Sequence, residues 1–537
     1  MAEGNKRIWI YMPIILAGVL SLGILLGERM SMNDKVQFSL PIPLHFNKKN
    51  KVDEVLNYIE EQYVDTVSRK KLEEKTITAL LQNLDPHSSY ISSEDLKATN
   101  EPLKGSFDGI GIEFSIIGDT IRVVTPLSGG PSEALGIQAG DKIVKIEGRN
   151  AAGIKITNQN VIDKLRGEEG TKVNITIQRG NASKPINYTI TRGKIPIYSV
   201  DVAYMVNKKT GYIKVSRFAA TTYDEYISAF NKLRSQGMEQ LIFDLRGNPG
   251  GLLNIAVNFA DEFLPEGKEI VYTEGRVSPK RVFTATRQGN FEKEKLIILI
   301  DEGSASASEI VAGAVQDNDR GIIVGRRSFG KGLVQEQAEL SDGSALRLTV
   351  ARYYTPTGRC IQKSYSNGSE AYYNEEVERY EHGELLNADS IKVINSLKYT
   401  TPGGKVVYGG GGIMPDVFVP IDTGGRSAFL SEVIYTGLLN QYAYDYADKH
   451  RGELNAYKNF EAFNSAFNIS NIMLDDFISF AERNKIKRNE KDIKTSEKIL
   501  KIQLKAYIAR NIWHSEGFYP VIHTIDNTFK KAVELTN

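Results

Sequence analysis

The chain has 537 residues, a length that predicts about three or four domains. Its formal net charge is +1 and 25% of its residues are charged, so charge alone implies no attraction to nucleic acid or to a membrane surface. The single cysteine, Cys360, excludes a disulfide within the chain and, without a neighbouring histidine, argues against a cysteine nucleophile.

The first residues, 1–34, have the pattern of a membrane anchor. Lys6 and Arg7 precede an uncharged stretch, Ile8 to Gly27, which is long enough to span a bilayer as a helix. No clear cleavage site follows, so we expect an uncleaved single-pass anchor in the inner (cytoplasmic) membrane, with the chain after Glu28 on the periplasmic or extracytoplasmic side. A cleaved signal peptide and a soluble periplasmic protein are the alternative.

Residues 35–104 predict a linker followed by a helical segment. Pro41 and Pro43 discourage regular structure, whereas apolar residues recur at helical spacing from Lys51 to Asn83 and predict a pair of helices. The phrase LDPHSSYIS then follows, and we interpret it as an ordinary turn and helix-cap signal. The same phrase can imitate a catalytic cluster through Asp85, His87 and Ser88.

Residues 105–195 predict a small β domain with two short helices. The phrases GIGIEF, IRVVTPL, PSEALG, GDKIVKIEG, VIDKLRG and KVNITIQR follow in an order that strongly resembles a PDZ domain. In that family the backbone N–H groups of a glycine-containing loop bind a peptide's C-terminal carboxylate, and the peptide then adds as a strand. The resemblance implies a carboxylate loop made of Asp108, Gly109, Ile110, Gly111 and Ile112. A β domain without a ligand is the alternative.

Residues 196–424 alternate strand and helix patterns, which predicts an α/β core with a mixed sheet and helices. Within it, QLIFDLRGNPGG runs from a strand into a glycine-rich turn, Arg246 to Gly251, before the next helix. Such a turn can donate backbone N–H groups to a reacting carbonyl oxygen. A plain tight turn between a strand and a helix remains the competing interpretation.

A second stretch of the core, Lys295 to Gln335, predicts strand, small-residue turn, helix and strand. The turn carries Ser304, Ser306 and Ser308 at the start of the predicted helix EIVAGAV. Free backbone N–H groups and the positive end of the helix dipole point at such a turn, so it can stabilise an oxyanion. Serines are also ordinary helix caps, and Ser304 fits that simpler role.

Lys331 follows the second strand of this stretch. Gly330 and Gly332 on either side of it favour close backbone packing and a partly buried amine, whose lowered pKa would suit a general base. A phosphate-binding loop competes, because Gly325, Gly330 and Lys331 spell G-x-x-x-x-G-K. That motif needs Ser or Thr and a helix next, whereas Gly332 and a hairpin pattern follow here. A Ser/His/Asp triad also stays open, although a Ser/Lys dyad needs no histidine.

Several unusual phrases of the chain stand in one characteristic order. YVDTVSRKKLEEKTITALLQNLDPHSSYIS, the PDZ-like module, FDLRGNPGG, GSASASEIVAGA, FGKGLVQ and GIMPDV occur in the order typical of carboxyl-terminal processing peptidases, also called tail-specific proteases. The resemblance covers roughly Lys51 to Asp422. It implies a serine peptidase with no metal or organic cofactor.

The resemblance also assigns roles to individual residues. Ser306 matches the family's nucleophile, Lys331 its general base, and Gln335 a glutamine that orients the amine in some members. Asp317 matches an aspartate that is important in some relatives, and we interpret it as structural. The implied donors to the oxyanion are the N–H groups of Ala307 and Gly250, with Gly251 equally defensible.

Two functions therefore stand against each other at this point. The first is a membrane-anchored serine endopeptidase that cleaves protein C-terminal tails outside the cytoplasm, with the PDZ domain delivering the tail or gating the site. The second is a catalytically inactive, PDZ-bearing scaffold, which the matching Ser306, Lys331 and Gln335 disfavour.

Two regions depart from the family pattern. The polar and acidic stretch Ser364 to Ser396 predicts a surface excursion, and residues 425–537 predict a helical extension. We expect the extension to mediate homodimerisation or adaptor binding, or else to cap the core. Protein substrates are the expected partners, together with the membrane at the N-terminus and without nucleic acid.

Overall fold

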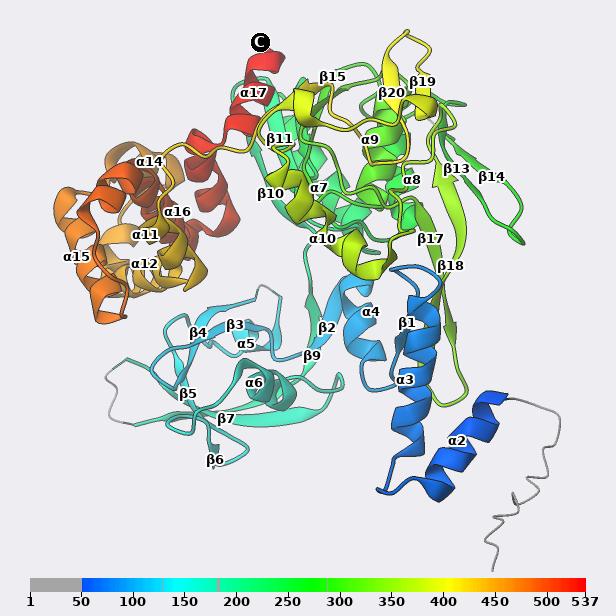
Figure 1. Cartoon of the computed structure of the whole chain (residues 1–537). Helices are drawn as coiled ribbons and strands as arrows, with labels where there is room; N and C mark the ends of the chain where they lie inside the picture. Colours follow the sequence, from blue (N-terminus) through cyan, green and yellow to red (C-terminus); the bar gives the residue numbers. More distant parts are fainter. Residues whose placement is uncertain (1–50, 128, 181–183, 287) are drawn as a thin grey trace, which may run out of the picture. The chain divides into compact units, whose positions relative to one another are not determined.

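A computed structural model describes residues 51–127, 129–180, 184–286 and 288–537 (Figure 1). The described residues divide into two compact units, with the boundary between Glu73 and Glu74. The predicted anchor and the linker before Lys51 lie outside the described residues. Across the described ranges, no helix combines the length and the apolar character that crossing a bilayer requires.

The predicted pair of helices is confirmed as α2 (Lys51–Gln62) and α3 (Arg69–Gln82), and α4 (Leu96–Lys104) follows. Between α3 and α4, the phrase LDPHSSYIS forms more than a turn. Its residues Ser89–Ile91 are a short strand, β1, which pairs antiparallel with β18 (Ala345–Tyr354). The phrase therefore belongs to a sheet of the second unit, and its strand partner β18 comes much later in the sequence.

The predicted β domain is confirmed, with the apolar side chains of its strands forming a core of their own. Its helices are α5 (Pro131–Ala134) and α6 (Asn158–Leu165), and a separate ribbon pairs β2 (Ser106–Gly109) with β9 (Gly193–Pro196). Strand β3 lies at one edge of the main sheet, so it has an open side to which another strand can add. The sheet comprises β3 (Ile112–Ile116), β4 (Ile121–Pro126), β5 (Lys142–Ile146), β7 (Lys172–Gln178) and β8 (Ile186–Thr191), with β6 (Arg149–Asn150) on β5.

The α/β core is built on a six-stranded sheet that is parallel except for its first strand. Runs of branched apolar residues explain it, since a parallel sheet is buried on both faces. In order, its strands are β10 (Val200–Met205), β11 (Thr210–Val215), β12 (Gln240–Asp244), β15 (Lys295–Ile300), β16 (Ile322–Gly325) and β21 (Val417–Phe418).

The two faces of this sheet bury alternate residues of each strand. On β12, Phe243 packs with the helices α7 (Thr222–Ser235), α8 (Leu253–Phe263) and α9 (Ala307–Asp317), whereas Ile242 packs against α17 (Asn527–Thr536). The catalytic stretch predicted from the sequence, strand, turn, helix and strand, is β15, α9 and β16.

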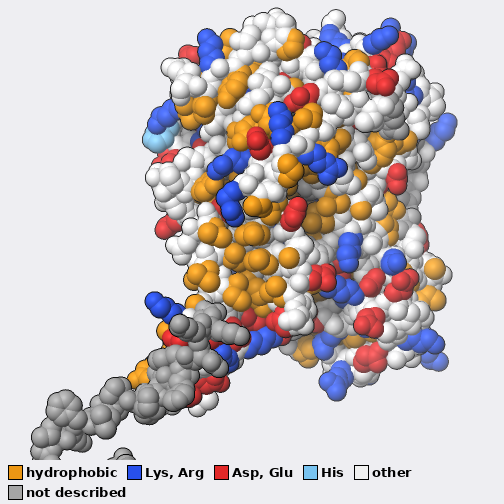
Figure 2. Space-filling model, turned by 90° about the vertical axis from the view of Figure 1, so that its right-hand side faces the viewer, with side chains coloured by type: hydrophobic (Ala, Val, Ile, Leu, Met, Phe, Trp, Pro, Cys, Tyr) orange, Lys and Arg blue, Asp and Glu red, His pale blue; other side chains and the backbone are white. Residues whose placement is uncertain are grey.

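A second, five-stranded sheet packs beside the first. It contains β1, β13 (Glu269–Glu274), β14 (Arg281–Thr284), β17 (Leu333–Glu339) and β18, and the hairpin predicted after Lys331 is β17 and β18. This sheet lies at the right of Figure 1, on the side that Figure 2 turns toward the viewer. Hydrophobic side chains gather in the middle of that side, while positive and negative side chains mix over the rest (Figure 2).

The stretch Ser364 to Ser396 lies mostly on the surface, as its polar composition predicts, but it is anchored to the core at a few buried residues. It forms the helix α10 (Gly368–Glu381) and two short 3-10 turns, η1 (Ala388–Ser390) and η2 (Asn395–Leu397). Tyr372 and Arg379 of α10 are almost completely buried. What the composition did not predict is this anchoring, in which Glu375 and Glu384 pair with cations of the core, as described below. A small hairpin of β19 (Lys398–Thr400) and β20 (Val406–Tyr408) follows.

The predicted C-terminal helices are confirmed, and they pack in two different places. Most of them enclose a hydrophobic core of their own, whereas η3 (His523–Ile525) and α17 pack on the six-stranded sheet. A homodimer or an adaptor at this region stays a prediction. The helices of the separate core are α11 (Ala428–Tyr435), α12 (Leu438–Lys449), α13 (Arg451–Asn455), α14 (Phe460–Ala466), α15 (Asn471–Arg483) and α16 (Glu490–Ile522).

Candidate active site

The candidate residues gather at the carboxyl ends of three parallel strands. The turn from Arg246 to Gly251 follows β12, the serine turn follows β15, and the segment with Lys331 follows β16. In open α/β sheets, this edge is where binding and catalytic residues normally lie. The topology therefore brings together the two sequence stretches that were singled out separately.

Ser306 stands at the start of α9 in a strained backbone conformation. Its φ is 53° and its ψ is −112°, a region that non-glycine residues rarely occupy and that is typical of functional sites. The flanking Ser304 and Ser308 are fully buried, and their hydroxyls donate to the carbonyls of Leu245 (2.8 Å) and Asn248 (2.9 Å). These two serines therefore fasten the serine turn to the glycine-rich turn.

The glycine-rich turn approaches Ser306 too closely for side chains. A Cβ atom on Gly250 would lie 2.8 Å from Ser306 Cβ and 2.9 Å from the nitrogen of Ala307, and Gly250 has a φ of 102°. The N–H of Gly250 donates to Asn248 Oδ1 at 2.9 Å. Among the described residues, none accepts a hydrogen bond from the backbone N–H of Ala307 or Gly251. The oxyanion assignments remain predictions, with Ala307 and Gly251 free to donate.

Buried ion pairs of Arg246 hold the same turn in place. Arg246 binds Asp244 through Nη2 at 2.6 Å and Asp526 of the C-terminal region at 2.8 Å. Tyr212 also donates to Asp244, at 2.6 Å. Burial acts to raise the pKa of Asp244, but Arg246 and Lys214 hold that pKa well below its ordinary value. Asp244 therefore stays ionised and keeps Arg246 fixed.

Lys331 has the environment that its flanking glycines predict. Its Nζ donates to Gln335 Oε1 at 3.0 Å, so the structure joins the two residues that the family resemblance pairs. Burial, and then the positive charge of Arg347 on β18, lower the pKa of Lys331. Within the described residues, no hydrogen bond joins Ser306 Oγ to this amine. Catalytic hydrogen bonds are often long before substrate binds, so the amine can still serve Ser306.

Glu309 is a site residue that the sequence reasoning missed. Fully buried in α9, it accepts from the backbone N–H of Ser306 (2.8 Å), of Gly330 (2.7 Å) and of Lys331 (2.9 Å), and from the hydroxyl of Ser328. Burial raises its pKa to about 7 in spite of these bonds. One carboxyl group thus holds the nucleophile's segment and the lysine's segment together. The S-x-x-E spacing of Ser306 and Glu309 was the signal that could have drawn attention to it.

Two further residues near Lys331 escaped prediction. Tyr353 of β18 donates to the carbonyl of Lys331, and its hydroxyl lies 3.1 Å from the carbonyl oxygen of Ser306. The backbone carbonyl of His87, in the phrase interpreted as a turn, accepts from Gln335 Nε2 at 2.5 Å. Burial, followed by the charge of Lys331, lowers the pKa of His87 to about 4, so its ring is neutral near pH 7.

The predicted carboxylate loop of the β domain overlaps two strands, because Asp108 and Gly109 end β2 and Ile112 begins β3, which leaves Ile110 and Gly111 as the connection. Asp108 pairs with Lys97 at 2.9 Å, and Ile110 is buried in the domain core. Among the described residues, none accepts a hydrogen bond from the backbone N–H of Ile110 or Gly111. Gly111 has a φ of 74°, which favours glycine. The loop therefore offers free donors beside the edge strand β3, and its ligand remains a prediction.

Asp317 lies away from the reacting groups, in a structural setting. It is buried and paired with the buried Arg359 at 2.7 Å, and it also accepts from Thr357. This geometry fits the structural interpretation made from the sequence. Burial raises the pKa of the thiol of Cys360, which does not suit a nucleophile. Among the described residues, no group of His, Cys, Asp and Glu side chains has the arrangement of a metal site.

Comparison with protein families matches three parts of the chain. The model of peptidase family S41 matches residues 209–368, which contain the glycine-rich turn, Ser306 and Lys331. A PDZ domain model matches residues 122–179. A family of unknown function matches residues 429–514, within the C-terminal helices.

Comparison with individual proteins gives relatives of the same kind. A carboxy-terminal-processing protease of Bartonella bacilliformis is 40% identical over 314 residues, which cover 58% of this chain and 71% of the relative. A protein named as a CtpA-like serine protease of Staphylococcus aureus is 36% identical, over 58% of this chain and 62% of the relative. The solved photosystem II D1 C-terminal processing protease is 29% identical, covers 68% of this chain and 86% of its own, and has a TM-score of 0.34.

Proposed function

The chain belongs to peptidase family S41 as a serine-type carboxy-terminal-processing protease, and on that basis we propose that it cleaves the C-terminal tails of proteins. The observation that carries this proposal is the environment of Lys331. Lys331 is buried and has a lowered pKa. Its backbone N–H and that of the strained Ser306 both donate to the carboxyl group of Glu309, which holds the two segments together. Such a lysine is neutral at a lower pH than an exposed one, as a general base must be.

Acylation of the enzyme follows from this geometry. Neutral Lys331 accepts the proton of the Ser306 hydroxyl, and Ser306 Oγ attacks the carbonyl carbon of the scissile peptide. The tetrahedral oxyanion is stabilised by backbone N–H groups, with Ala307 and Gly251 as donors because the N–H of Gly250 already donates to Asn248. The protonated lysine then gives its proton to the leaving amine as the scissile C–N bond breaks, and the acyl carbon remains bonded to Ser306 Oγ as an ester.

Hydrolysis of the ester reverses these roles. The lysine, again neutral, accepts a proton from a water molecule whose oxygen attacks the ester carbonyl. The proton returns to Ser306 Oγ as the ester bond breaks, and the shortened protein leaves. Gln335 keeps the amine oriented throughout, because its Oε1 accepts one N–H of Lys331.

The PDZ domain supplies the selection of tails in this proposal. The free N–H groups of Ile110 and Gly111 bind the terminal carboxylate, and the tail adds to the open edge of β3. We further propose that the protein acts on the periplasmic or extracytoplasmic side. The basis for this location is the sequence of residues 1–34 alone. The donors and the edge strand support tail binding, and the apolar N-terminal sequence supports the location.

The test is cleavage of an unfolded protein that ends in an apolar tail, measured with the full chain and with its Ser306→Ala and Lys331→Ala variants. We expect the wild type to cut and both variants to lose at least about a thousandfold in kcat, since each removes a reacting group. Amidation of the tail should raise KM and leave kcat unchanged. An inert wild type on every tail would favour the scaffold function, and cutting by either variant would reject the dyad.

A further inference from the structure

The side-chain amide of Gln335 is held at both of its ends. Its Oε1 accepts from Lys331 Nζ at 3.0 Å, and its Nε2 donates to the backbone carbonyl of His87 at 2.5 Å. An amide has an acceptor end and a donor end, so the partner at one end decides what the other end presents. The His87 carbonyl therefore determines that Gln335 turns its oxygen, and not its NH₂ group, toward the lysine.

His87 is itself held from two directions. Its backbone N–H donates to Asp85 Oδ1 at 2.8 Å, within its own segment. Its ring Nε2 shares a hydrogen bond of 2.8 Å with the hydroxyl of Tyr372, and the two rings meet edge to face at 5.2 Å. The neighbouring Tyr373 donates to the carbonyl of Pro86 at 2.7 Å. Both tyrosines belong to α10, the helix of the stretch that the sequence placed on the surface.

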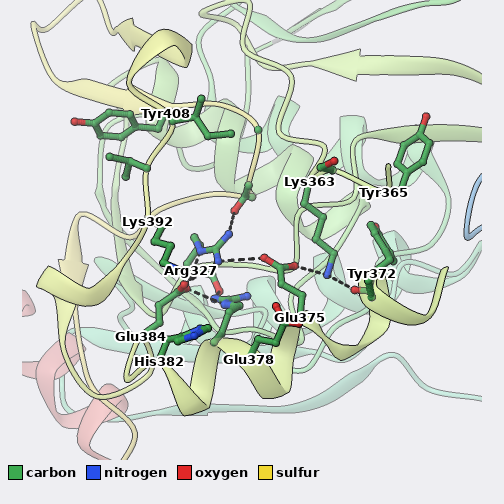
Figure 3. Close-up of a pocket in the computed structure, with 18 of the residues that line it drawn as sticks. Arg327, Lys363, Tyr365, Tyr372, Glu375, Glu378, His382, Glu384, Lys392 and Tyr408 are labelled. Carbon is green, nitrogen blue, oxygen red and sulfur yellow. Dashed lines mark hydrogen bonds and ion pairs between the residues drawn. The ribbon is translucent and has the colours of Figure 1, made fainter. Parts of the chain in front are cut away.

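The helix α10 is anchored to the segment that leads into Lys331. In Figure 3, Glu375 of α10 points between Arg327 and Lys363, with its carboxylate 3.4 Å from the first and 2.5 Å from the second. Arg379 donates to the carbonyls of Arg327 and of Ser328. These groups line one side of a cavity of about 370 Å³ (Figure 3). Glu375 and Arg379 thus fix α10 against the core.

We propose that Tyr372 is a positioning residue for the catalytic lysine, acting through His87 and Gln335. This inference rests on the proposed function and deepens it. The stretch Ser364 to Ser396 sets the orientation of Gln335, and a movement of α10 away from His87 releases the amide to rotate. An amide turned by half a rotation presents NH₂ to the amine of Lys331, which is then no longer held toward Ser306.

The surroundings of Lys331 determine how such a release would be seen. Burial is the largest cause of the lowered pKa of Lys331, so water that enters beside a loosened His87 raises that pKa toward its ordinary value. The acidic limb of the pH profile then moves to higher pH. The charged and titratable groups that act in this environment are Arg347 of β18, Asp85 before β1, Glu309 of α9, and the ring of His87, which also feels Lys363.

The first experiment compares Tyr372→Phe with Tyr380→Phe in tail cleavage. Tyr380 lies on the same helix but is 51% exposed, so its variant controls for changes to α10 itself. We expect Tyr372→Phe to lower kcat about tenfold, with KM unchanged and the acidic limb at higher pH, and Tyr380→Phe to behave as wild type. Unchanged kcat and pH profile in Tyr372→Phe would overturn the proposal.

A double-mutant cycle separates positioning from a general loss of stability. If Tyr372 acts through Gln335, Tyr372→Phe has no further effect on kcat in a Gln335→Ala background. If the two effects multiply, the residues act independently and the proposal fails. Thermal unfolding of each variant shows whether a change in folding accompanies the change in rate.

A second readout needs no substrate and therefore separates this proposal from the proposed function. In the Ser306→Ala background, the rate at which cyanate carbamylates Lys331 is followed by peptide mass spectrometry across pH, which yields the pKa of the amine. We expect this pKa to rise in Tyr372→Phe and to stay unchanged in Tyr380→Phe. Equal values in both variants would reject the positioning role even if the protein cleaves tails, and a rise would support it even if no tail is cut.

Discussion

The two sides of the active site are built in different ways. The serine side consists of two contiguous stretches, Arg246 to Gly251 and Ser304 to Glu309, which bind each other through backbone groups and two buried hydroxyls. The lysine side brings Lys331 together with side chains and carbonyls from distant parts of the chain, including His87 and Tyr372. The comparison teaches that a short motif can specify a nucleophile, whereas the lowered pKa of a lysine depends on tertiary structure.

Glu309 is where the two sides meet, and Glu309→Gln should have the largest effect. The amide keeps one acceptor oxygen but turns an NH₂ group toward backbone N–H donors of Ser306, Gly330 or Lys331. A buried backbone donor left without its acceptor costs about 1–3 kcal/mol, so we expect Ser306 and Lys331 to lose their alignment and kcat to fall about a hundredfold. Glu302→Gln is the control, because Glu302 pairs with Arg326 nearby. A wild-type kcat in Glu309→Gln would mean that the two sides hold their places independently.

The same residue gives a pH dependence of stability. The pKa of Glu309 is raised from 4.5 to about 7, so between these values the folded protein keeps a proton that the unfolded chain has lost. Its contribution to the free energy of unfolding therefore falls as the pH rises through this window, by up to about 3 kcal/mol. Chemical denaturation of wild type and Glu309→Gln across the window measures the difference, and parallel curves would contradict it.

Ser308→Ala tests the serine side alone. It removes the buried hydroxyl that donates to Asn248, which should lower the free energy of unfolding by about 1 kcal/mol and kcat a fewfold. The acidic limb of kcat/KM should stay where it is, because the lysine side is untouched. Urea denaturation and a pH series check both points, with the exposed Ser431→Ala as control. A shift of the acidic limb of kcat/KM in Ser308→Ala would show that the serine side affects the pKa of Lys331 by a route other than Glu309.

Arg347→Gln tests the lysine side alone. Arg347 is the second cause of the lowered pKa of Lys331, after burial, so its removal raises that pKa. Because the lysine must be neutral to act, the acidic limb of kcat/KM should move to higher pH, with kcat at high pH retained. Arg352→Gln on the same strand, where Arg352 contacts Tyr365 instead, is the control. If the acidic limb of kcat/KM lies at the same pH in both variants, burial alone lowers the pKa of Lys331.

Asp526→Asn should have the smallest effect. Arg246 loses one ion pair but keeps its bonds to the buried Asp244, so we expect a loss of about 0.5–1 kcal/mol in unfolding free energy and less than a threefold change in kcat. Glu534→Gln, at an exposed pair on α17, is the matched control. A large fall in kcat would show that the turn from Arg246 to Gly251 depends on its contact with Asp526 more strongly than the geometry indicates.

The sequence predicted most of the fold, because its signals were strong and local. Branched apolar runs such as Leu296 to Ile300 became buried strands, and the period of EIVAGAV became α9. The pairing of Lys331 with Gln335 was also predictable, since both follow from one family phrase. The same holds for the hairpin after Gly332, which had already argued against a phosphate-binding loop.

The rest could not be predicted because it depends on partners far away in the chain. Two acidic residues of YYNEEVERYEHGE, Glu375 and Glu384, cannot be told from their exposed neighbours until Arg327 and Lys363 are placed beside them. His87 looked like part of a turn because nothing in the sequence shows that β1 pairs with β18. Glu309 looked like a helix-start residue, a role that it does combine with its contacts to the lysine segment.

The ion pair between Arg246 and Asp526 also relates the site to the order of synthesis. Asp526 follows every other residue of the site in the chain, so a growing polypeptide contains Ser306 and Lys331 well before Arg246 gains this partner. The turn that lies against Ser306 therefore reaches its full rigidity only after the C-terminal helices have been made and packed on the sheet. We therefore expect a nascent chain to complete this turn last, with only the small gain in stability and kcat that the Asp526→Asn variant measures.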